Sequence, residues 1–405
     1  MVRAVTLRPL LAATAALALA AGAPAARAQE RPRLDGAASA IVVDGRDGAV
    51  LLAKSPRARR SIASTTKLMT ALLTLERSRS RRVFAGTGYQ AGAAESKINL
   101  GRGERMRVGD LLEALLLESA NDAAVALAQG VSGSRDAFVS DMNARARQLG
   151  LRGTSYANPI GLDDQGNYST AADLAALARR LLRNRRFSSI VRMPSAELRS
   201  GSRPRTVRNR NDLVRSGVPA VTGVKTGYTG SAGYVLVGSA QAPNGARVVS
   251  VVLGEPSEAA RDADSLAALR WGIAQYRREP VLSAEAPVAR AGVELRSERV
   301  ALAPARDLNL TLRRGQRARK RVRAPREIEG PLPAGRRVGT VDVIKEGRVV
   351  RRVALVTTAD VQAASLLQRT LHSPAAPLTL VALLAILLGV LTLIWRRTRV
   401  GGGVG

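Results

Sequence analysis

The sequence predicts a mixed α/β domain, followed by a small all-β domain and one membrane-spanning helix near the C-terminus. Three observations point to this architecture. Short β-like runs alternate with long helical stretches over about residues 34–278, apolar residues recur with the two-residue period of strands over 288–357, and residues 375–395 carry no charge. The chain has 405 residues, 46% of them hydrophobic, which is enough for two or three domains with cores of their own.

The composition excludes several catalytic chemistries. The chain has no Cys, so it has no thiol nucleophile, disulfide or thiolate metal site. Its single histidine, His372, lies near the C-terminus, which argues against a Ser-His-Asp triad and a multi-histidine zinc site. We therefore expect no metal and no cofactor. Only six of the 63 basic residues are lysines, and lysine, unlike arginine, can act as a base when its pKa is lowered.

The N-terminus has the pattern of a secretory signal peptide, residues 1–28. Arg3 and Arg8 precede an apolar stretch from Leu10 to Ala21, and Ala26-Arg27-Ala28 predicts cleavage before Gln29. An uncleaved membrane anchor is the alternative.

The elements of the α/β domain follow from local patterns. Two β-like runs, Ala40–Asp44 and Ala49–Leu52, are split by glycines and predict a hairpin. Further strands are expected at Gly233–Val237 and Arg247–Leu253. Helices are expected at 64–77, 108–119, 122–129, 170–182 and 264–275.

The all-β domain is expected after a Pro/Ala/Glu-rich linker at Glu279–Pro287. Leu308, Leu310 and Leu312 alternate with polar residues, which is typical of a strand with one buried face. A weak helix is expected at Thr358–Leu371.

The uncharged segment 375–395 is long enough, at about 1.5 Å per residue, to cross about 30 Å of hydrocarbon. Three arginines follow it, a pattern that places residues 396–405 in the cytoplasm as a tail. We therefore expect a single-pass protein of the cell membrane whose catalytic domain is extracytoplasmic. A buried helix of a soluble domain is the alternative.

The first candidate catalytic motif is Ser64-Thr65-Thr66-Lys67, at the start of a predicted helix. Residues three apart on a helix share a face, so Lys67 can reach Ser64. A lysine neutralised by burial and by a second cation can accept the proton of a serine nucleophile. The alternative is that Ser64 only caps the helix.

Two more motifs complete the set. Ser119-Ala120-Asn121 lies between two predicted helices, where Ser119 can relay a proton and the amide of Asn121 can hold a peptide group. Lys225-Thr226-Gly227 precedes a predicted strand, where an exposed strand edge can bind an extended peptide and its carboxylate. Either motif alone could be an ordinary linker or turn.

Together, the three motifs resemble those of class A β-lactamases and penicillin-binding proteins. The chain is most similar to the D-alanyl-D-alanine carboxypeptidases, the low-molecular-mass penicillin-binding proteins of serine peptidase family S11. The resemblance covers about residues 37–272, and residues 335–339 resemble that family's C-terminal domain more loosely. It implies a transpeptidase-like fold, an antiparallel sheet flanked by helices plus a helical subdomain. The stretches that carry the resemblance are 63–70, 119–123, 158–162 and 223–229.

The resemblance also implies a mechanism. Ser64 would attack the bond between the two terminal D-alanines of a peptidoglycan stem peptide, with Lys67 as base and with Ser119 and Lys225 passing the proton to the leaving D-alanine. β-Lactams would be covalent inhibitors. The backbone N–H groups of Ser64 and Tyr228 would form the oxyanion hole. The implied substrate-binding residues are Asn121, Thr226, Gly227, Tyr228, Arg210 and Arg261.

The rival functions are a β-lactamase or a DD-endopeptidase on the same fold, and a wall-binding protein without catalysis. The basic run Arg313–Arg326 carries eight positive charges and no acidic residue. Export and the absence of aromatic residues in the run argue against nucleic acid as its partner. Anionic lipid, an acidic wall polymer, or no partner at all remain the interpretations of this run.

Overall fold

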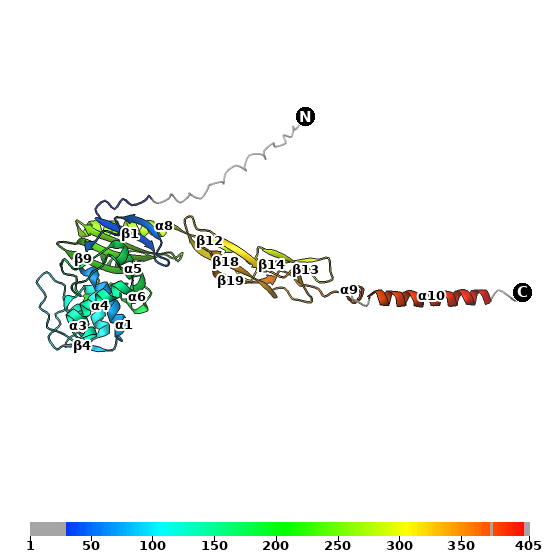
Figure 1. Ribbon diagram of the computed structural model, residues 1–405, viewed down its shortest axis with the longest axis horizontal. Helices are drawn as coiled ribbons and strands as arrows, with labels where there is room; N and C mark the ends of the chain where they lie inside the picture. The colour runs from blue at the N-terminus through cyan, green and yellow to red at the C-terminus, as the bar shows by residue number, and fades with distance from the viewer. Residues whose placement is uncertain (1–29, 373–375, 401–405) are drawn as a thin grey trace, which may run out of the picture. The chain divides into compact units, whose positions relative to one another are not determined.

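The structure is a computed structural model that describes residues 30–372 and 376–400. The predicted signal peptide, residues 1–28, lies outside the described residues, as do residues 401–405 of the predicted tail. The contacts divide the chain into two units, coloured from blue to red along the chain in Figure 1. The first is the chain to Ala240 with Val248–Ala274, and the second is Gln241–Arg247 with the chain from Gln275 onwards.

The first unit is built on a five-stranded sheet of order β2-β1-β11-β10-β9. The predicted hairpin forms, since β1 pairs antiparallel with β2, and β9 lies at the free edge beside β10. The strands are β1 (Ser39–Asp44), β2 (Val50–Lys54), β9 (Val221–Thr229), β10 (Gly233–Gln241) and β11 (Arg247–Glu255).

Side chains alternate between the two faces of this sheet, and both faces are covered by other parts of the unit. On one face, Ile41 and Val43 join the main apolar core with the helices. On the other face, helix α8 (Glu258–Ala274) packs closely at Gly272, where an added Cβ would lie 2.9 Å from Val42. The sheet is therefore a rigid support for the edge strand β9.

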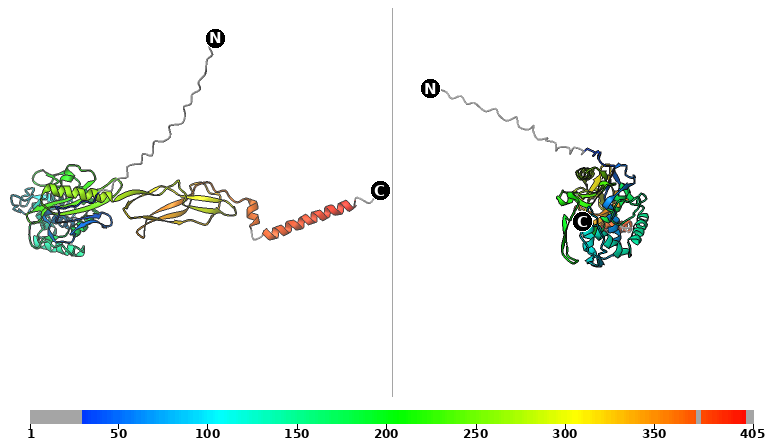
Figure 2. Two further views of the ribbon diagram at one scale, coloured as in Figure 1. Left: turned by 90° about the horizontal axis from the view of Figure 1, so that it is seen from above. Right: turned by 90° about the vertical axis from the view of Figure 1, so that its left-hand side faces the viewer.

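The helical part of this unit includes α1, α3 and α4, which Figures 1 and 2 show gathered on one side of the sheet. Thr170 caps α5 by accepting a hydrogen bond from the backbone N–H of Asp173 at 3.0 Å, as its spacing predicts. Helix α4 was not predicted, because only Phe138, Met142 and Ala146 of its residues are buried among charged neighbours. The helices are α1 (Lys67–Arg77), α2 (Val108–Glu113), α3 (Asn121–Ser132), α4 (Arg135–Gln148), α5 (Ala171–Leu181), α6 (Arg185–Ile190) and α7 (Asp212–Arg215).

Three two-stranded ribbons border the helices, pairing β3 with β6, β4 with β5 and β7 with β8. Their strands are β3 (Arg60–Ser61), β4 (Val83–Ala85), β5 (Arg105–Arg107), β6 (Tyr168–Ser169), β7 (Ser195–Leu198) and β8 (Arg205–Arg208).

The second unit is β-rich, as expected, with a six-stranded sheet of order β16-β18-β19-β14-β13-β17 and a ribbon of β12 with β15. Leu282 of β12 and Leu308 of β15 pack in a small core with Val341 and Val353 of the sheet. The strands are β12 (Tyr276–Leu282), β13 (Ala289–Val293), β14 (Arg299–Pro304), β15 (Leu308–Arg313), β16 (Ala318–Arg323), β17 (Glu327–Ile328), β18 (Arg337–Lys345) and β19 (Arg348–Thr357).

The linker expected at Glu279–Pro287 is partly wrong, because its first residues belong to β12. Glu279 pairs with Leu310, and Leu282 with Leu308. The proline-containing sequence hides this strand, whose partner lies some thirty residues further along the chain. Pro280 fits there because a strand of a two-stranded ribbon has an unpaired edge.

The C-terminal segment contains helices α9 (Leu366–Leu371) and α10 (Ala376–Val400). Helix α9 is shorter than the helix expected at Thr358–Leu371, because Val361 instead forms a β-bridge with Leu332. In the part of the chain that the structure describes, no helix is both long enough and apolar enough to cross a membrane.

Candidate active site

Ser64 lies in a 3-10 turn, Ala63–Thr66, that leads directly into α1. The sequence predicts one continuous helix here, whereas the structure begins with the tighter turn. Lys67 is the first residue of α1 and its side chain is fully buried. Its Nζ lies 2.9 Å from Ser64 Oγ, a distance at which a proton can pass between the two atoms.

A loop holds Lys67 in this position. Lys67 Nζ donates a hydrogen bond to the backbone carbonyl of Ile160 at 2.5 Å. The side chain of Asn158 shapes the loop by accepting a hydrogen bond from the N–H of Gly161 at 2.7 Å. Gly161 has φ +87°, and a Cβ there would lie 2.0 Å from the carbonyl oxygen of Ala63, so glycine is required for this approach.

Burial and a second cation favour the neutral form of Lys67. Removal from water lowers its pKa well below the usual value, and the positive charge of Lys225 lowers it further. Burial, with Arg210 and Arg261 nearby, also lowers the pKa of Lys225, to about 7. A neutral Lys67 has a free lone pair and can act as a base.

Ser119 and Asn121 lie where a π-helical turn, Ala114–Glu118, meets α3. Ser119 has φ 64°, a left-handed conformation that is costly for a residue other than glycine. Asn121 Nδ2 donates a hydrogen bond to Glu95 Oε2 at 2.5 Å, and its backbone N–H binds the carbonyl of Ser96 at 2.8 Å.

The Lys-Thr-Gly motif precedes the strand at Gly233, as expected, and itself lies within another strand, β9. Lys225 is buried, and its Nζ donates to the carbonyl of Thr226 at 2.9 Å. At Gly227 a Cβ would come within 2.9 Å of Ser64 N, so only glycine lets the strand pass this close to Ser64. Tyr228 is exposed, and its ring stacks on Tyr234 with centroids 4.3 Å apart.

The two arginines differ in their surroundings. Arg210 is half-exposed and forms an ion pair with Glu118, at the end of the π-helical turn. Arg261, on α8, is buried and forms ion pairs with Glu258 at 2.9 Å and with Asp262 at 2.8 Å. Burial lowers the pKa of Lys225, and the positive charges of Arg210 and Arg261 lower it further.

These residues surround one cavity of about 370 Å³. Three predicted site residues are buried beside the cavity. They hydrogen-bond residues of the site: Lys67 bonds Ser64, Asn121 bonds Glu95, and Lys225 bonds Thr226. The other seven predicted site residues line the cavity: Ser64, Ser119, Thr226, Gly227, Tyr228, Arg210 and Arg261.

Sequence reasoning missed Glu95 and the two acidic residues in the cavity wall, Asp212 and Glu258. Asp212 lies two residues after Arg210, and Glu258 lies three residues before Arg261. Their closeness in sequence to the predicted arginines could have pointed to both acidic residues. Glu95 had no such signal, because it lies 26 residues before Asn121.

Comparison with known proteins identifies the family. A profile of the D-alanyl-D-alanine carboxypeptidase family matches residues 25–257, more than half of the chain. The chain belongs to this family. It is a serine-type D-Ala-D-Ala carboxypeptidase, as the resemblance predicts. Residues 276–363 of the carboxypeptidase match the C-terminal domain of penicillin-binding protein 5.

Relatives match along most of their length. The carboxypeptidase is 31% identical to D-alanyl-D-alanine carboxypeptidase DacF of Bacillus subtilis, over 83% of this chain and 89% of the relative. It is also 31% identical to DacA of Escherichia coli K12, over 82% of this chain and 84% of the relative. The crystal structure of penicillin-binding protein 5 from Haemophilus influenzae superposes with a TM-score of 0.57 at 29% identity, covering 81% of this chain and 98% of that one. The predicted transpeptidase-like fold with a β-rich C-terminal domain is confirmed.

Proposed function

We propose that the carboxypeptidase removes the terminal D-alanine from peptidoglycan stem peptides through an acyl-enzyme on Ser64. The observation that carries this proposal is the 2.9 Å contact between Ser64 Oγ and the Nζ of the fully buried Lys67. In the described part of the chain, no other serine hydroxyl hydrogen-bonds a lysine amine.

The proposed acylation step transfers one proton from Ser64 to the leaving amine. Ser64 Oγ attacks the carbonyl carbon between the two D-alanines while its proton passes to the lone pair of Lys67 Nζ. The negative oxygen of the tetrahedral intermediate would be held by the backbone N–H groups of Ser64 and Tyr228. The C–N bond then breaks, and the leaving amine takes a proton through Ser119 and Lys225. Water hydrolyses the resulting ester and restores the Ser64 hydroxyl.

The remaining residues would bind the substrate. The edge strand β9 offers its backbone to an extended peptide, as strand-adding peptides require. Thr226, with the positive field of Arg210 and Arg261, would take the terminal carboxylate. The amide of Asn121, held by Glu95, would bind a peptide group of the stem.

The test is direct. The purified protein should release free D-alanine from diacetyl-Lys-D-Ala-D-Ala and should form a long-lived adduct with a fluorescent penicillin. Rapid hydrolysis of the penicillin without release of D-alanine would identify a β-lactamase instead.

We further propose that the enzyme acts in the cell envelope, exported by residues 1–28 and anchored by residues 375–395 with the tail 396–405 in the cytoplasm. This proposal rests on the uncharged segment and on the arginines that follow it. The catalytic domain, 34–278, and the β-domain, 288–357, would then both be extracytoplasmic.

A further inference from the structure

The basic run forms a hollow on the β-rich unit that the peptidase reaction does not use. The turn between β15 and β16 and the edge strand β16 border a hollow of about 1070 Å³ together with the turn between β18 and β19. Six cationic residues line it: Arg313, Arg314, Arg317, Arg319, Lys320 and Arg321.

The charge of this hollow is largely uncompensated. Its one acidic lining residue, Glu346, already accepts a hydrogen bond from Gln316 at 2.6 Å and lies 3.6 Å from Arg313. Among the described residues, no carboxylate forms an ion pair with Arg314, Arg317 or Arg319, and all three are exposed. Several guanidinium groups with free donors favour an anion that carries more than one charge, and phosphate oxygens match their geometry.

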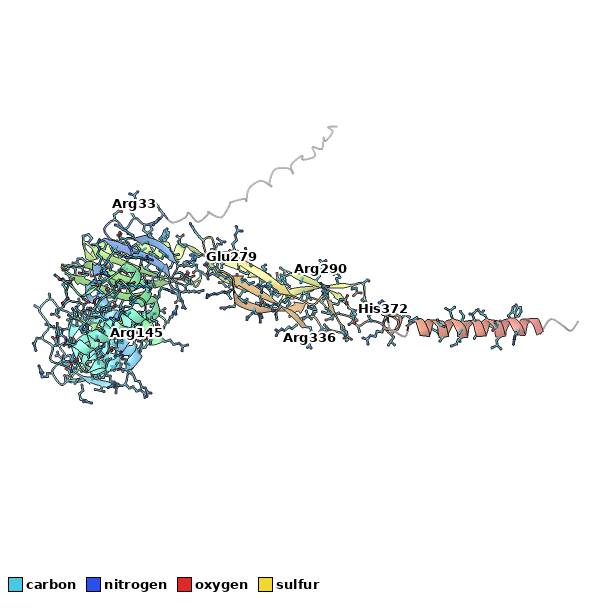
Figure 3. The ribbon with its side chains drawn as sticks, viewed as in Figure 1. Arg33, Arg145, Glu279, Arg290, Arg336 and His372 are labelled. Carbon is cyan, nitrogen blue, oxygen red and sulfur yellow. The ribbon has the colours of Figure 1, made fainter. Side chains whose placement is uncertain are left out.

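The position of the hollow within its unit helps to distinguish two sources of phosphate, the lipid headgroups of a membrane and a polymer of the cell wall. The hollow lies where β12 begins, since Tyr276 pairs with Arg313 and Ala318 with Lys345. The chain leaves the six-stranded sheet of this unit at the other end, beyond Thr357 of β19. Nine residue steps along β19 span about 30 Å. Figure 3 shows the same order, with Glu279 of β12 toward one end and Arg336 toward the end from which the chain continues to His372.

This separation disfavours a bilayer as the partner. In the proposed anchoring, residues 358–374 connect the end of β19 to the membrane segment, so the length of β19 and this connection both separate the hollow from that segment along the chain. Attraction to lipid headgroups is screened within about 8 Å at physiological salt, much less than about 30 Å. A polymer that extends through the cell wall can reach the hollow at a greater distance from the membrane surface.

We propose that this hollow is a second binding site, which takes a phosphodiester polymer of the cell wall. On a strand, side chains of one face recur about every 7 Å, so a flexible chain with one negative charge per repeat meets several arginines at once. Binding releases counterions and therefore weakens steeply with salt. The site would hold the enzyme within the wall without changing its chemistry on a small peptide.

The experiment uses the full chain in phosphatidylcholine nanodiscs, with fluorescent poly(glycerol phosphate) as the probe. Binding should be measurable at 50 mM salt and should weaken at least tenfold at 500 mM. The triple variant Arg314→Gln, Arg317→Gln, Arg319→Gln should lose at least tenfold in affinity. The matched control Arg290→Gln, Arg299→Gln, Arg306→Gln removes the same charge from exposed arginines outside the hollow and should stay within about twofold of the wild type.

Release of D-alanine and the melting temperature should be unchanged in both variants. Equal losses in the two variants would overturn the proposal, because net charge alone would then account for binding. Absence of binding by the wild type would also overturn it. Competition by dihexanoyl phosphatidylglycerol as strong, per phosphate, as by the polymer would assign the hollow to lipid headgroups instead.

Discussion

Glu95 Oε2 accepts a hydrogen bond from Asn121 Nδ2 at 2.5 Å, which joins a loop residue outside every motif to the Ser-x-Asn element. The same carboxylate accepts hydrogen bonds from the hydroxyl of Tyr89 at 2.8 Å and from the N–H of Gly92 at 2.9 Å. Its pKa is lowered by these donors and by the charge of Lys67, although burial opposes the shift. Glu95 thus positions Asn121 and places a negative charge near Lys67.

We expect Glu95→Gln to move the acid limb of the pH profile of acylation to lower pH. The charge of Glu95 raises the pKa of Lys67, so its removal lets Lys67 lose its proton at lower pH. The rate of labelling by a fluorescent penicillin between pH 5 and 9 measures the shift. Glu197→Gln, which removes the same charge from an exposed strand, is the control and should leave the profile unchanged.

Glu95→Ala removes the acceptor as well as the charge. This hydrogen bond is partly buried, and loss of one partner costs about 1–3 kcal/mol, which corresponds to about 5- to 150-fold in kcat/KM if Asn121 loses its position. Activity in Glu95→Ala equal to that of Glu95→Gln would show that the hydrogen bond is unimportant.

Ser64→Ala should abolish covalent labelling by penicillin. The melting temperature should hardly change, because Lys67 keeps its hydrogen bond to the carbonyl of Ile160. Labelling at the wild-type level would rule out Ser64 as the nucleophile. Mass spectrometry of the labelled peptide from the wild type checks the same assignment independently.

Lys67→Arg keeps a positive charge but supplies no base near neutral pH. Acylation should fall by about 10²–10⁴-fold, as is typical when general-base catalysis is lost. The control is the thermal melt, since Lys67 is fully buried and its replacement could disturb packing. A folded variant that acylates at nearly the wild-type rate would exclude Lys67 as the base.

Lys225 should make stability depend on pH. Its folded pKa is about 7 and its usual value is 10.5, so the unfolded chain binds one more proton between these values. The free energy of unfolding that this residue contributes therefore rises with pH from about 7 to 10.5, because the cost of burial is largest at low pH. Urea unfolding of the wild type and of Lys225→Met at pH 7, 8, 9 and 10 measures it. Parallel curves would contradict the lowered pKa.

Truncation before Pro374 should release an active enzyme from membranes. The segment removed contains the uncharged residues 375–395 and the arginines after them. Sedimentation at high salt, followed by an assay of D-alanine release, checks the result. A truncated protein that still sediments with membranes would place an anchor elsewhere, at an uncleaved signal segment or at residues before His372.

Local spacing made much of this enzyme predictable. A serine and a lysine three residues apart must share one face of a helical turn, and the scarcity of lysine drew attention to Lys67 and Lys225. Alternating and periodic apolar residues likewise placed four of the five strands of the central sheet and five of the eight α-helices described in the first unit, but neither β9 nor the short ribbon strands. The assignment of Ser119, Asn121 and Lys225 to one site came from resemblance, since no local rule joins residues so far apart.

The sequence by itself therefore determined the fold class and the family, and predicted Ser64 and Lys67 as nucleophile and base, because these depend on spacing within a turn or on whole motifs. Tertiary structure alone decided that the Ile160 carbonyl holds Lys67, that Glu95 holds Asn121 and that β12 is a strand. It also set the lowered pKa values of the two lysines. The physical reason is that burial and pairing arise from contacts between segments that are distant in the chain, so a local sequence pattern does not reveal them.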